Sequence, residues 1–140
     1  MVKKVFYGIG ILLVLIQFFQ IDRTNPPVTA EPKWDSADTR ELARKACFDC
    51  HSNESKYPFY AYIAPFSWLV KNHIEEGREN LNFSEWKNDV DIDEIADEVN
   101  NDEMPLWDYK LMHSESRLTE SEKNRLILGL TKTFELSEAK

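Results

Sequence analysis

The stretch RKACFDCHSN, residues 44–53, holds both cysteines of this 140-residue chain. Cys47 and Cys50 lie three residues apart, and His51 follows the second cysteine at once. Residues three apart on a helical turn lie on one side of it, so both thiols can reach one planar ligand. If two cysteines and three histidines were scattered at random, this pattern would arise in roughly three chains in ten thousand. The spacing therefore predicts a binding site.

Covalent attachment of haem needs this set of groups in this order. Cys47 and Cys50 would form thioethers with the two vinyl groups, and His51 would bind the iron as the proximal ligand. Phe48 and Asp49 fill the two positions between the cysteines, where the chemistry requires no particular residue. The motif predicts one covalent haem c.

Two other uses of the same residues compete with haem. A disulfide or a redox-active pair of the thioredoxin type has this cysteine spacing, but such pairs follow a strand in an α/β domain, and no βαβ pattern is visible. A zinc ion would need His73 or His113 to complete its ligands, and adjacent Cys50 and His51 do not easily reach one ion from a helix. Both alternatives are disfavoured.

The second face of a haem iron has few candidate ligands. Met104 is the first choice, because Pro105 stiffens the loop that would direct its sulfur, and a thioether raises the reduction potential as in electron carriers. His73 is the alternative, either as distal ligand or as partner of a haem propionate, because it falls on an apolar helix face. Met112 and His113 are weaker candidates.

Composition and charge fit a small globular domain that does not bind nucleic acid. The chain is 42% hydrophobic and 12% aromatic, enough for one modest core. Residues 1–30 contain three of the 17 basic and one of the 25 acidic side chains, so the remainder carries a net charge of −10. Such a surface repels phosphate backbones, and no nucleic acid partner is expected.

The N-terminus predicts a transmembrane or signal-anchor helix. Lys3 and Lys4 precede a mainly apolar run over residues 5–21, which at about 1.5 Å per residue is at the lower limit for a membrane span. The lysines favour an inside N-terminus and place the domain on the extracytoplasmic, periplasmic side. Cleavage near residues 28–30, which would release the protein to the periplasm, is the alternative.

The predicted organisation is an anchor over residues 1–21, a proline-containing linker over 22–35 and a haem-binding domain over 36–140. The domain shows helical periodicity and no convincing strands. Four helices are predicted in it. The first begins at the capping pair Asp38 and Glu41 and runs through Cys50, and the second begins at Pro65 and has an apolar stripe through Gly77. The third covers residues 92–99, and the last begins at the capping box of Thr119 and Glu122.

Beyond the pentad, the order of motifs resembles the bacterial haem-binding domain family, which is related to c-type cytochromes. The resemblance rests on residues 47–54, 62–70 and 72–78, on 81–86, and on Met104-Pro105 with the helix that follows, and it covers about residues 31–135. It implies covalent haem with His51 as proximal ligand and, in many members, one N-terminal anchor. By analogy with small cytochromes c, the end helices should pack together beside the haem.

These observations predict an all-α, cytochrome c-like domain that carries single electrons between extracytoplasmic redox proteins and is not an enzyme. A haem-based sensor or small-ligand binder with an open or displaceable sixth iron position is the alternative. An oxidase or peroxidase subunit would need polar catalytic groups over the open face, which only His73, His113 and nearby carboxylates could supply.

Overall fold

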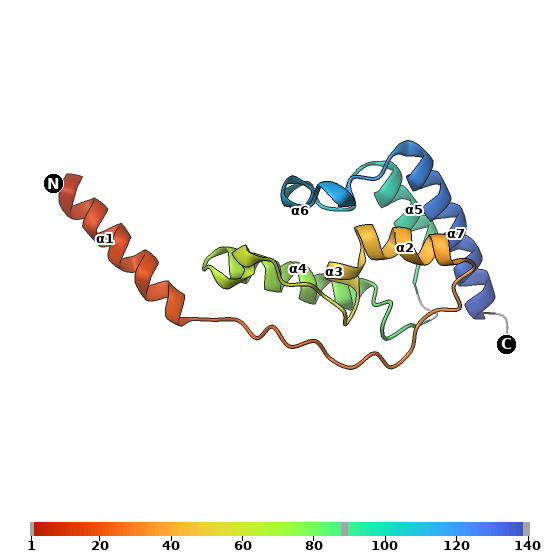
Figure 1. Ribbon diagram of the computed structural model, residues 1–140, viewed down its shortest axis with the longest axis horizontal. Helices are drawn as coiled ribbons and strands as arrows, with labels where there is room; N and C mark the ends of the chain where they lie inside the picture. The colour runs from red at the N-terminus through yellow and green to blue at the C-terminus, as the bar shows by residue number, and fades with distance from the viewer. Residues whose placement is uncertain (1, 88–89, 139–140) are drawn as a thin grey trace.

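The chain folds as a series of helices joined by extended segments (Figure 1). The computed structural model describes residues 2–87 and 90–138. Within them the regular structure is helical, apart from one isolated parallel bridge between Ala30 and Glu85, so the predicted all-α class is confirmed. The helices are α1 (Val2–Leu15), α2 (Ala37–Ala46), α3 (Phe48–His51), α4 (Phe66–Asn80), α5 (Ile92–Asn100), α6 (Trp107–Met112) and α7 (Glu120–Glu138), with short 3-10 helices η1 (Ile16–Phe18), η2 (Phe59–Tyr62) and η3 (Ser114–Ser116).

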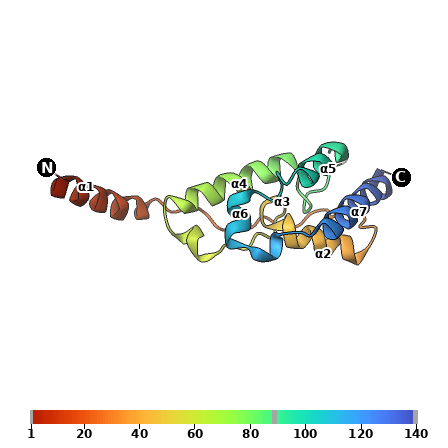
Figure 2. The same ribbon diagram turned by 90° about the horizontal axis from the view of Figure 1, so that it is seen from above.

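Two groups of helices make up the domain. The long C-terminal helix α7 packs against α2 and α5 at one end of the molecule, whereas α4 packs against α3 and η2 toward the other end (Figures 1 and 2). The short helix α3 joins these groups, because it contacts both α2 and α4. The cysteine motif therefore lies where the two halves of the domain meet.

The first helix of the domain ends before the cysteine motif, and this corrects the single helix predicted through Cys50. Helix α2 begins after Ser36, whose hydroxyl accepts a hydrogen bond from the Thr39 amide, and it ends at Ala46, with Cys47 as its C-cap. A new turn then starts, because the amides of Cys50 and His51 both donate to the Cys47 carbonyl. The motif consequently occupies a separate helix, α3.

The last helix follows the sequence closely. Thr119 and Glu122 form the predicted capping box: the Glu122 carboxylate accepts from the Thr119 amide at 2.8 Å, and the Thr119 hydroxyl accepts from the Glu122 amide at 3.3 Å. Helix α7 meets α2 at very close range, since a Cβ at Gly129 would lie 2.0 Å from the Thr39 hydroxyl oxygen. The two end helices pack against each other as expected.

Aromatic rings fill the centre of the domain. Phe48, between the two cysteines, is 2% exposed and stacks on Phe83 with ring centroids 5.4 Å apart. Trp34 lies against both rings, and Trp86 stacks on the far side of Phe83. Burying side chains of this size contributes about 2–3 kcal/mol each. Helix α3 is thus fixed to the core by the residue inside its own motif.

The N-terminal apolar run does not form one continuous α-helix over residues 5–21. Helix α1 ends at Leu15, and the Gln17 side chain turns back to donate to the Leu13 carbonyl and to the Ala64 carbonyl. Within residues 2–87 and 90–138, the structure contains no helix with the length and apolar character needed to cross a membrane. The predicted spanning helix is therefore not supported.

The extended segment over residues 22–35 lies along the domain (Figure 1). The Asn25 side-chain Nδ2 donates to the Ser55 carbonyl at 2.9 Å, and the Thr29 backbone amide donates to the Ser84 carbonyl at 2.9 Å. Further along, Trp34 enters the aromatic core. We call residues 20–35 the strap, because they are hydrogen-bonded along the surface of the domain and end with Trp34 packed in the aromatic core.

Candidate haem site

The two thiols of the motif lie at the two ends of the first turn of α3. Cys47 precedes the helix and Cys50 lies within it, and both are free thiols. Burial raises the pKa of each thiol to about 12; the negative charges of Asp49 and Asp108 also raise that of Cys50. Both cysteines therefore stay protonated at neutral pH. This disfavours a redox-active pair, which needs a thiolate of lowered pKa.

His51 is held by its backbone and by one ring nitrogen. Its Nδ1 lies 3.1 Å from the Leu81 carbonyl oxygen, and its own carbonyl accepts from the Phe83 amide at 2.8 Å. Burial lowers the pKa of the imidazole, although the carbonyls of Leu81 and Gly77 act in the opposite direction. A neutral imidazole that donates from Nδ1 to a carbonyl keeps its lone pair on Nε2. This is the usual way in which proteins orient a metal-binding histidine.

Helix α4 approaches the motif at Gly77. A Cβ at this position would lie 2.7 Å from the Cys50 carbonyl oxygen and 3.1 Å from the Cys50 Cβ. A side chain there would displace either α4 or α3. The sequence places Gly77 at the end of an apolar stripe but does not show that it faces Cys50.

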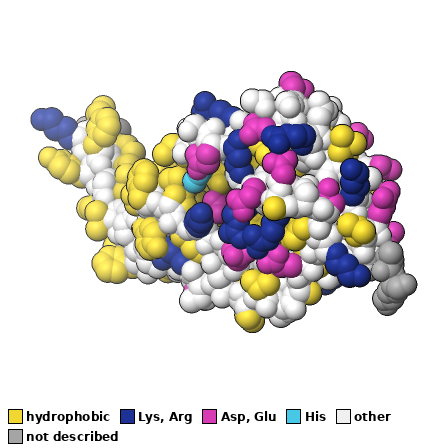
Figure 3. Space-filling model, turned by 45° about the vertical axis from the view of Figure 1, so that its right-hand side comes forward, with side chains coloured by type: hydrophobic (Ala, Val, Ile, Leu, Met, Phe, Trp, Pro, Cys, Tyr) yellow, Lys and Arg dark blue, Asp and Glu magenta, His cyan; other side chains and the backbone are white. Residues whose placement is uncertain are grey.

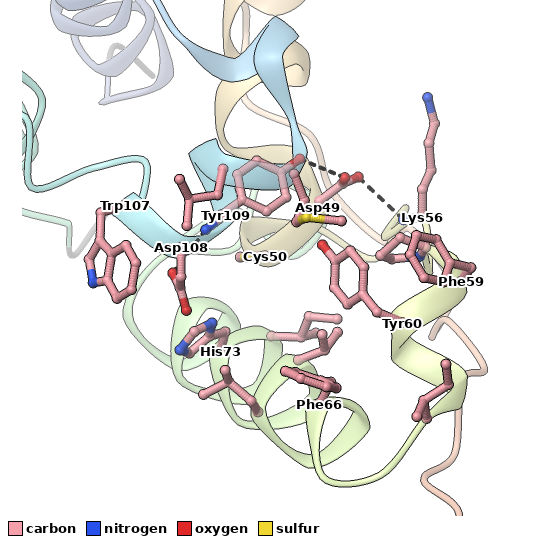
Figure 4. A pocket seen from close by; sticks show the side chains of 17 residues that line it. Asp49, Cys50, Lys56, Phe59, Tyr60, Phe66, His73, Trp107, Asp108 and Tyr109 are labelled. Carbon is pink, nitrogen blue, oxygen red and sulfur yellow. Dashed lines mark hydrogen bonds between the residues drawn. The ribbon is translucent and has the colours of Figure 1, made fainter.

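A cavity of about 550 Å³ opens beside Cys50. Its walls come from α3, α4, α6 and the segment around η2, and they are mainly apolar (Figure 4). Phe66 and Leu69 of α4 face it and are 56% and 47% exposed, so this part of the predicted stripe lines the cavity and is not buried in the core. The volume and lining are typical of a cofactor or small-molecule site.

Asp49, the second residue between the cysteines, organises the upper wall of the cavity. Its carboxylate accepts a hydrogen bond of 2.8 Å from the Tyr109 hydroxyl and one of 3.3 Å from the Lys56 amide (Figure 4). Burial first, and then the charge of Asp49, raises the pKa of Tyr109, so its hydroxyl remains a donor. Both variable positions of the motif are thus structural: Phe48 points into the core and Asp49 fixes α6.

A second polar chain runs along the same wall. The Tyr60 hydroxyl lies 2.9 Å from His113 Nε2, and His113 Nδ1 lies 3.1 Å from the Glu115 carboxylate. His113 is therefore linked through its two ring nitrogens to both Tyr60 and Glu115. The His113 ring also stacks on Tyr109 at 4.1 Å. His113 therefore supports the wall, and it does not line the cavity.

Some of the candidate distal ligands line the cavity and others lie outside it. His73 of α4 and Met112 of α6 line the cavity, and Asp108 extends toward His73 in Figure 4. Met104 does not line it: this residue lies in the loop before α6, where its amide donates to the Glu98 carbonyl at 3.0 Å. The structure brings Cys50, His73 and Met112 to one cavity and places Met104 at the start of the segment that forms its wall.

The described part of the chain contains no cluster of side chains that would bind a metal ion directly. No three His, Cys, Asp or Glu side chains among residues 2–87 and 90–138 are arranged to hold a metal ion. A zinc site that joins the cysteines to His73 or His113 therefore has no support in this geometry.

The donor set and the cavity fit a haem. Cys50 lines the apolar cavity, whereas Cys47 and His51 do not line it and adjoin Cys50 through the short helix α3. A protonated thiol at an apolar cavity and a following imidazole oriented through Nδ1 are groups that covalent haem binding uses. No curated protein and no solved structure matches the chain in comparisons with known proteins. The sequence model of the haem-binding domain family matches residues 11–132, nearly the whole chain. The chain therefore belongs to the haem-binding domain family.

Proposed function

We propose that the protein binds one haem c covalently through Cys47 and Cys50, with His51 as the proximal iron ligand. The observation that carries this proposal is the pentad on its own short helix, with Cys50 in the wall of an apolar cavity and His51 fixed at Nδ1 by Leu81. Each thiol would add its S–H across a vinyl double bond, forming a carbon–sulfur bond and needing no oxidant. Bound haem would supply a one-electron couple.

Single-electron transfer is the function that this site supports best. Phe66, Leu69 and Trp107 provide apolar walls beside Cys50, and an apolar environment around a bound haem would help to set its reduction potential. We propose that the protein carries electrons between extracytoplasmic redox proteins and catalyses no reaction of its own.

The sixth iron ligand decides between two versions of this function. Met104 remains the sequence prediction, and a thioether ligand from the loop before α6 would suit an electron carrier. His73 is the alternative that already faces the cavity. Met112, which also lines it, is 55% exposed.

A sensor or small-ligand binder is the second candidate. The position of Met104 outside the cavity favours it, because a displaceable or absent sixth ligand leaves room for carbon monoxide on the reduced iron. Fast binding of carbon monoxide by the reduced protein would support this function, and a slow or absent reaction would support the carrier.

We also propose that α1 attaches the protein to a membrane with the domain on the extracytoplasmic side. All positions of α1 are exposed, its residues after Lys4 are mostly apolar, and Lys3 and Lys4 stand at its beginning. Extraction of bacterial membranes with alkaline carbonate tests this attachment. Release of the intact chain into the soluble fraction would contradict it.

The haem proposal is tested by expression with the haem-attachment machinery. The denatured protein should weigh one haem more than its amino acids, and a Cys47→Ser/Cys50→Ser double variant should lose that mass. His51→Ala should retain the mass but lose the low-spin absorption spectrum. A colourless wild-type protein with the bare polypeptide mass would refute the proposal.

The distal ligand is identified in the same preparation. Met104→Ala, His73→Ala and Met112→Ala are compared by absorption spectrum and by carbon monoxide binding to the reduced protein. Only the variant that lacks the sixth ligand should become high-spin and bind carbon monoxide quickly. No change in any of the three would contradict all three assignments.

A further inference from the structure

We propose that an aromatic belt beside the cavity rests on the headgroups of a lipid bilayer and fixes how the domain is held there. The belt consists of Phe18, Phe19, Tyr62 and Trp68. This inference rests on the proposed membrane attachment through α1 and adds a second contact, made by the folded domain itself.

The belt is assembled by hydrogen bonds between distant parts of the chain. The Gln17 side chain accepts from the Ala64 amide and donates to the Ala64 carbonyl, both at 3.0 Å. The Trp68 indole donates to the Phe19 carbonyl at 3.0 Å. The end of the N-terminal helical segment is therefore joined to the start of α4, so that exposed aromatic residues of the two segments belong to one end of the molecule.

Arg23 holds the third part of the belt. Its guanidinium lies 4.2 Å from the centre of the Tyr62 ring, and its Nε donates to the Ala61 carbonyl at 2.9 Å. This arrangement places a positive charge at the edge of an apolar surface. Anionic lipid headgroups attract such a charge.

The belt residues are exposed although they are large and apolar. Phe18 is 80% exposed, Phe19 69%, Tyr62 55% and Trp68 40%. Figure 3 shows hydrophobic side chains gathered over α1 and the adjoining end of the domain, whereas charged side chains dominate the rest of that face. Tyrosine and tryptophan favour the boundary between lipid and water, because each combines an apolar ring with a polar group.

The length of α1 explains why lipid would cover this surface. Its 14 residues extend about 21 Å at 1.5 Å per residue, and a hydrocarbon core is about 30 Å thick. Because α1 is too short to cross this layer, an attached α1 would keep the residues that follow it at the membrane surface. The groups after α1 are Phe18 and Phe19, and the bonds of Gln17 and Trp68 bring the domain with them.

The belt also sets the orientation of the cavity. Ile63 and Phe66 line the cavity and lie between Tyr62 and Trp68 in the sequence. The cavity end of the domain would then face the bilayer, and α7 would lie at the far end (Figure 2).

The test measures the reaction of single introduced cysteines with a polyethylene glycol maleimide, using the full-length haem-loaded protein. Phe19→Cys and Tyr62→Cys probe the belt. Leu128→Cys is the matched control, because Leu128 is apolar and 63% exposed but lies on α7. Labelling rates are compared with and without vesicles of equal parts phosphatidylcholine and phosphatidylglycerol. Wild-type protein should not react, because both native thiols would be bound in thioethers.

We expect vesicles to slow labelling about tenfold at the two belt positions and to leave Leu128→Cys unchanged. Vesicle-bound protein with unchanged rates at all three positions would overturn the belt while the membrane attachment stands. Failure of the wild type to bind vesicles would overturn the attachment and the belt together. Labelling of the wild type would identify a failure of haem attachment separately.

Discussion

Replacing Gly77 by alanine tests the close contact between α4 and the haem motif. Alanine in place of glycine within a helix stabilises it by about 1 kcal/mol when nothing obstructs the new methyl group. At Gly77 the methyl would lie 2.7 Å from the Cys50 carbonyl oxygen, a backbone atom that cannot rotate away. Overpacking of this kind costs about 1–3 kcal/mol. The two effects oppose each other, and the contact should prevail.

We therefore expect Gly77→Ala to reduce the free energy of unfolding by about 1 kcal/mol. For a chain of this size, that loss lowers the melting temperature by about 3 °C. Thermal unfolding of the haem-loaded protein, followed by circular dichroism at 222 nm in the far-ultraviolet range used for helices, measures this shift. Glu79→Ala is the control, because Glu79 is exposed on the same helix and its replacement should change stability by less than about 0.5 kcal/mol. A melting temperature of Gly77→Ala equal to or above that of the wild type would refute the close approach of α4 to Cys50.

Three further predictions concern the core, the cavity wall and the last helix. Phe48→Ala should destabilise the domain by about 3–5 kcal/mol in urea unfolding, since the ring is 2% exposed, whereas loss below about 1 kcal/mol would contradict its place in the core. Tyr109→Phe should reduce the free energy of unfolding by about 1 kcal/mol, because it removes the hydrogen bond to Asp49. If the two groups act as a pair, adding Asp49→Asn to this variant should cause little further loss of stability. Lys45 and the Thr119 groups lower the pKa of Glu122 from 4.5 to about 2, so its stabilising contribution is complete above pH 4.5 and is lost as the pH falls toward 2. Glu122→Gln should flatten that part of the stability profile, and an unchanged acid transition would contradict the assignment.

Local signals were sufficient for α7 and α5, whereas the predicted capping pair Asp38 and Glu41 was wrong, because α2 begins at Ala37 and is capped by the Ser36 hydroxyl. The capping box at Thr119 and the apolar spacing over residues 92–99 correspond to the start of α7 and to α5. The break between α2 and α3 at Cys47 could not be read in this way, because the apolar spacing continues through it. Helix α6 was missed because its six residues are too few to show a period.

The sequence predicted which residues form the candidate site, but it did not predict which residues contact them in the folded structure. The pentad predicts Cys47, Cys50 and His51 as the haem-binding residues, and this remains a prediction. It gave no sign that Phe48 enters the core, that Asp49 accepts from a tyrosine 60 positions away, or that Gly77 touches the motif. Each of these contacts depends on how α3 and α4 meet, and such a long-range packing relation leaves no periodic pattern in either segment.

The strap gives a structural meaning to the position at which the chain could be processed. A peptidase that cut after Ala30 would remove Arg23, Asn25 and Thr29, whose bonds tie the strap to Ala61, Ser55 and Ser84. The trimmed product would keep Trp34 against its core but would lose these three hydrogen bonds. Cleavage at this point would thus remove hydrogen bonds that hold the folded domain together, whereas retention of residues 22–30 keeps these bonds in place.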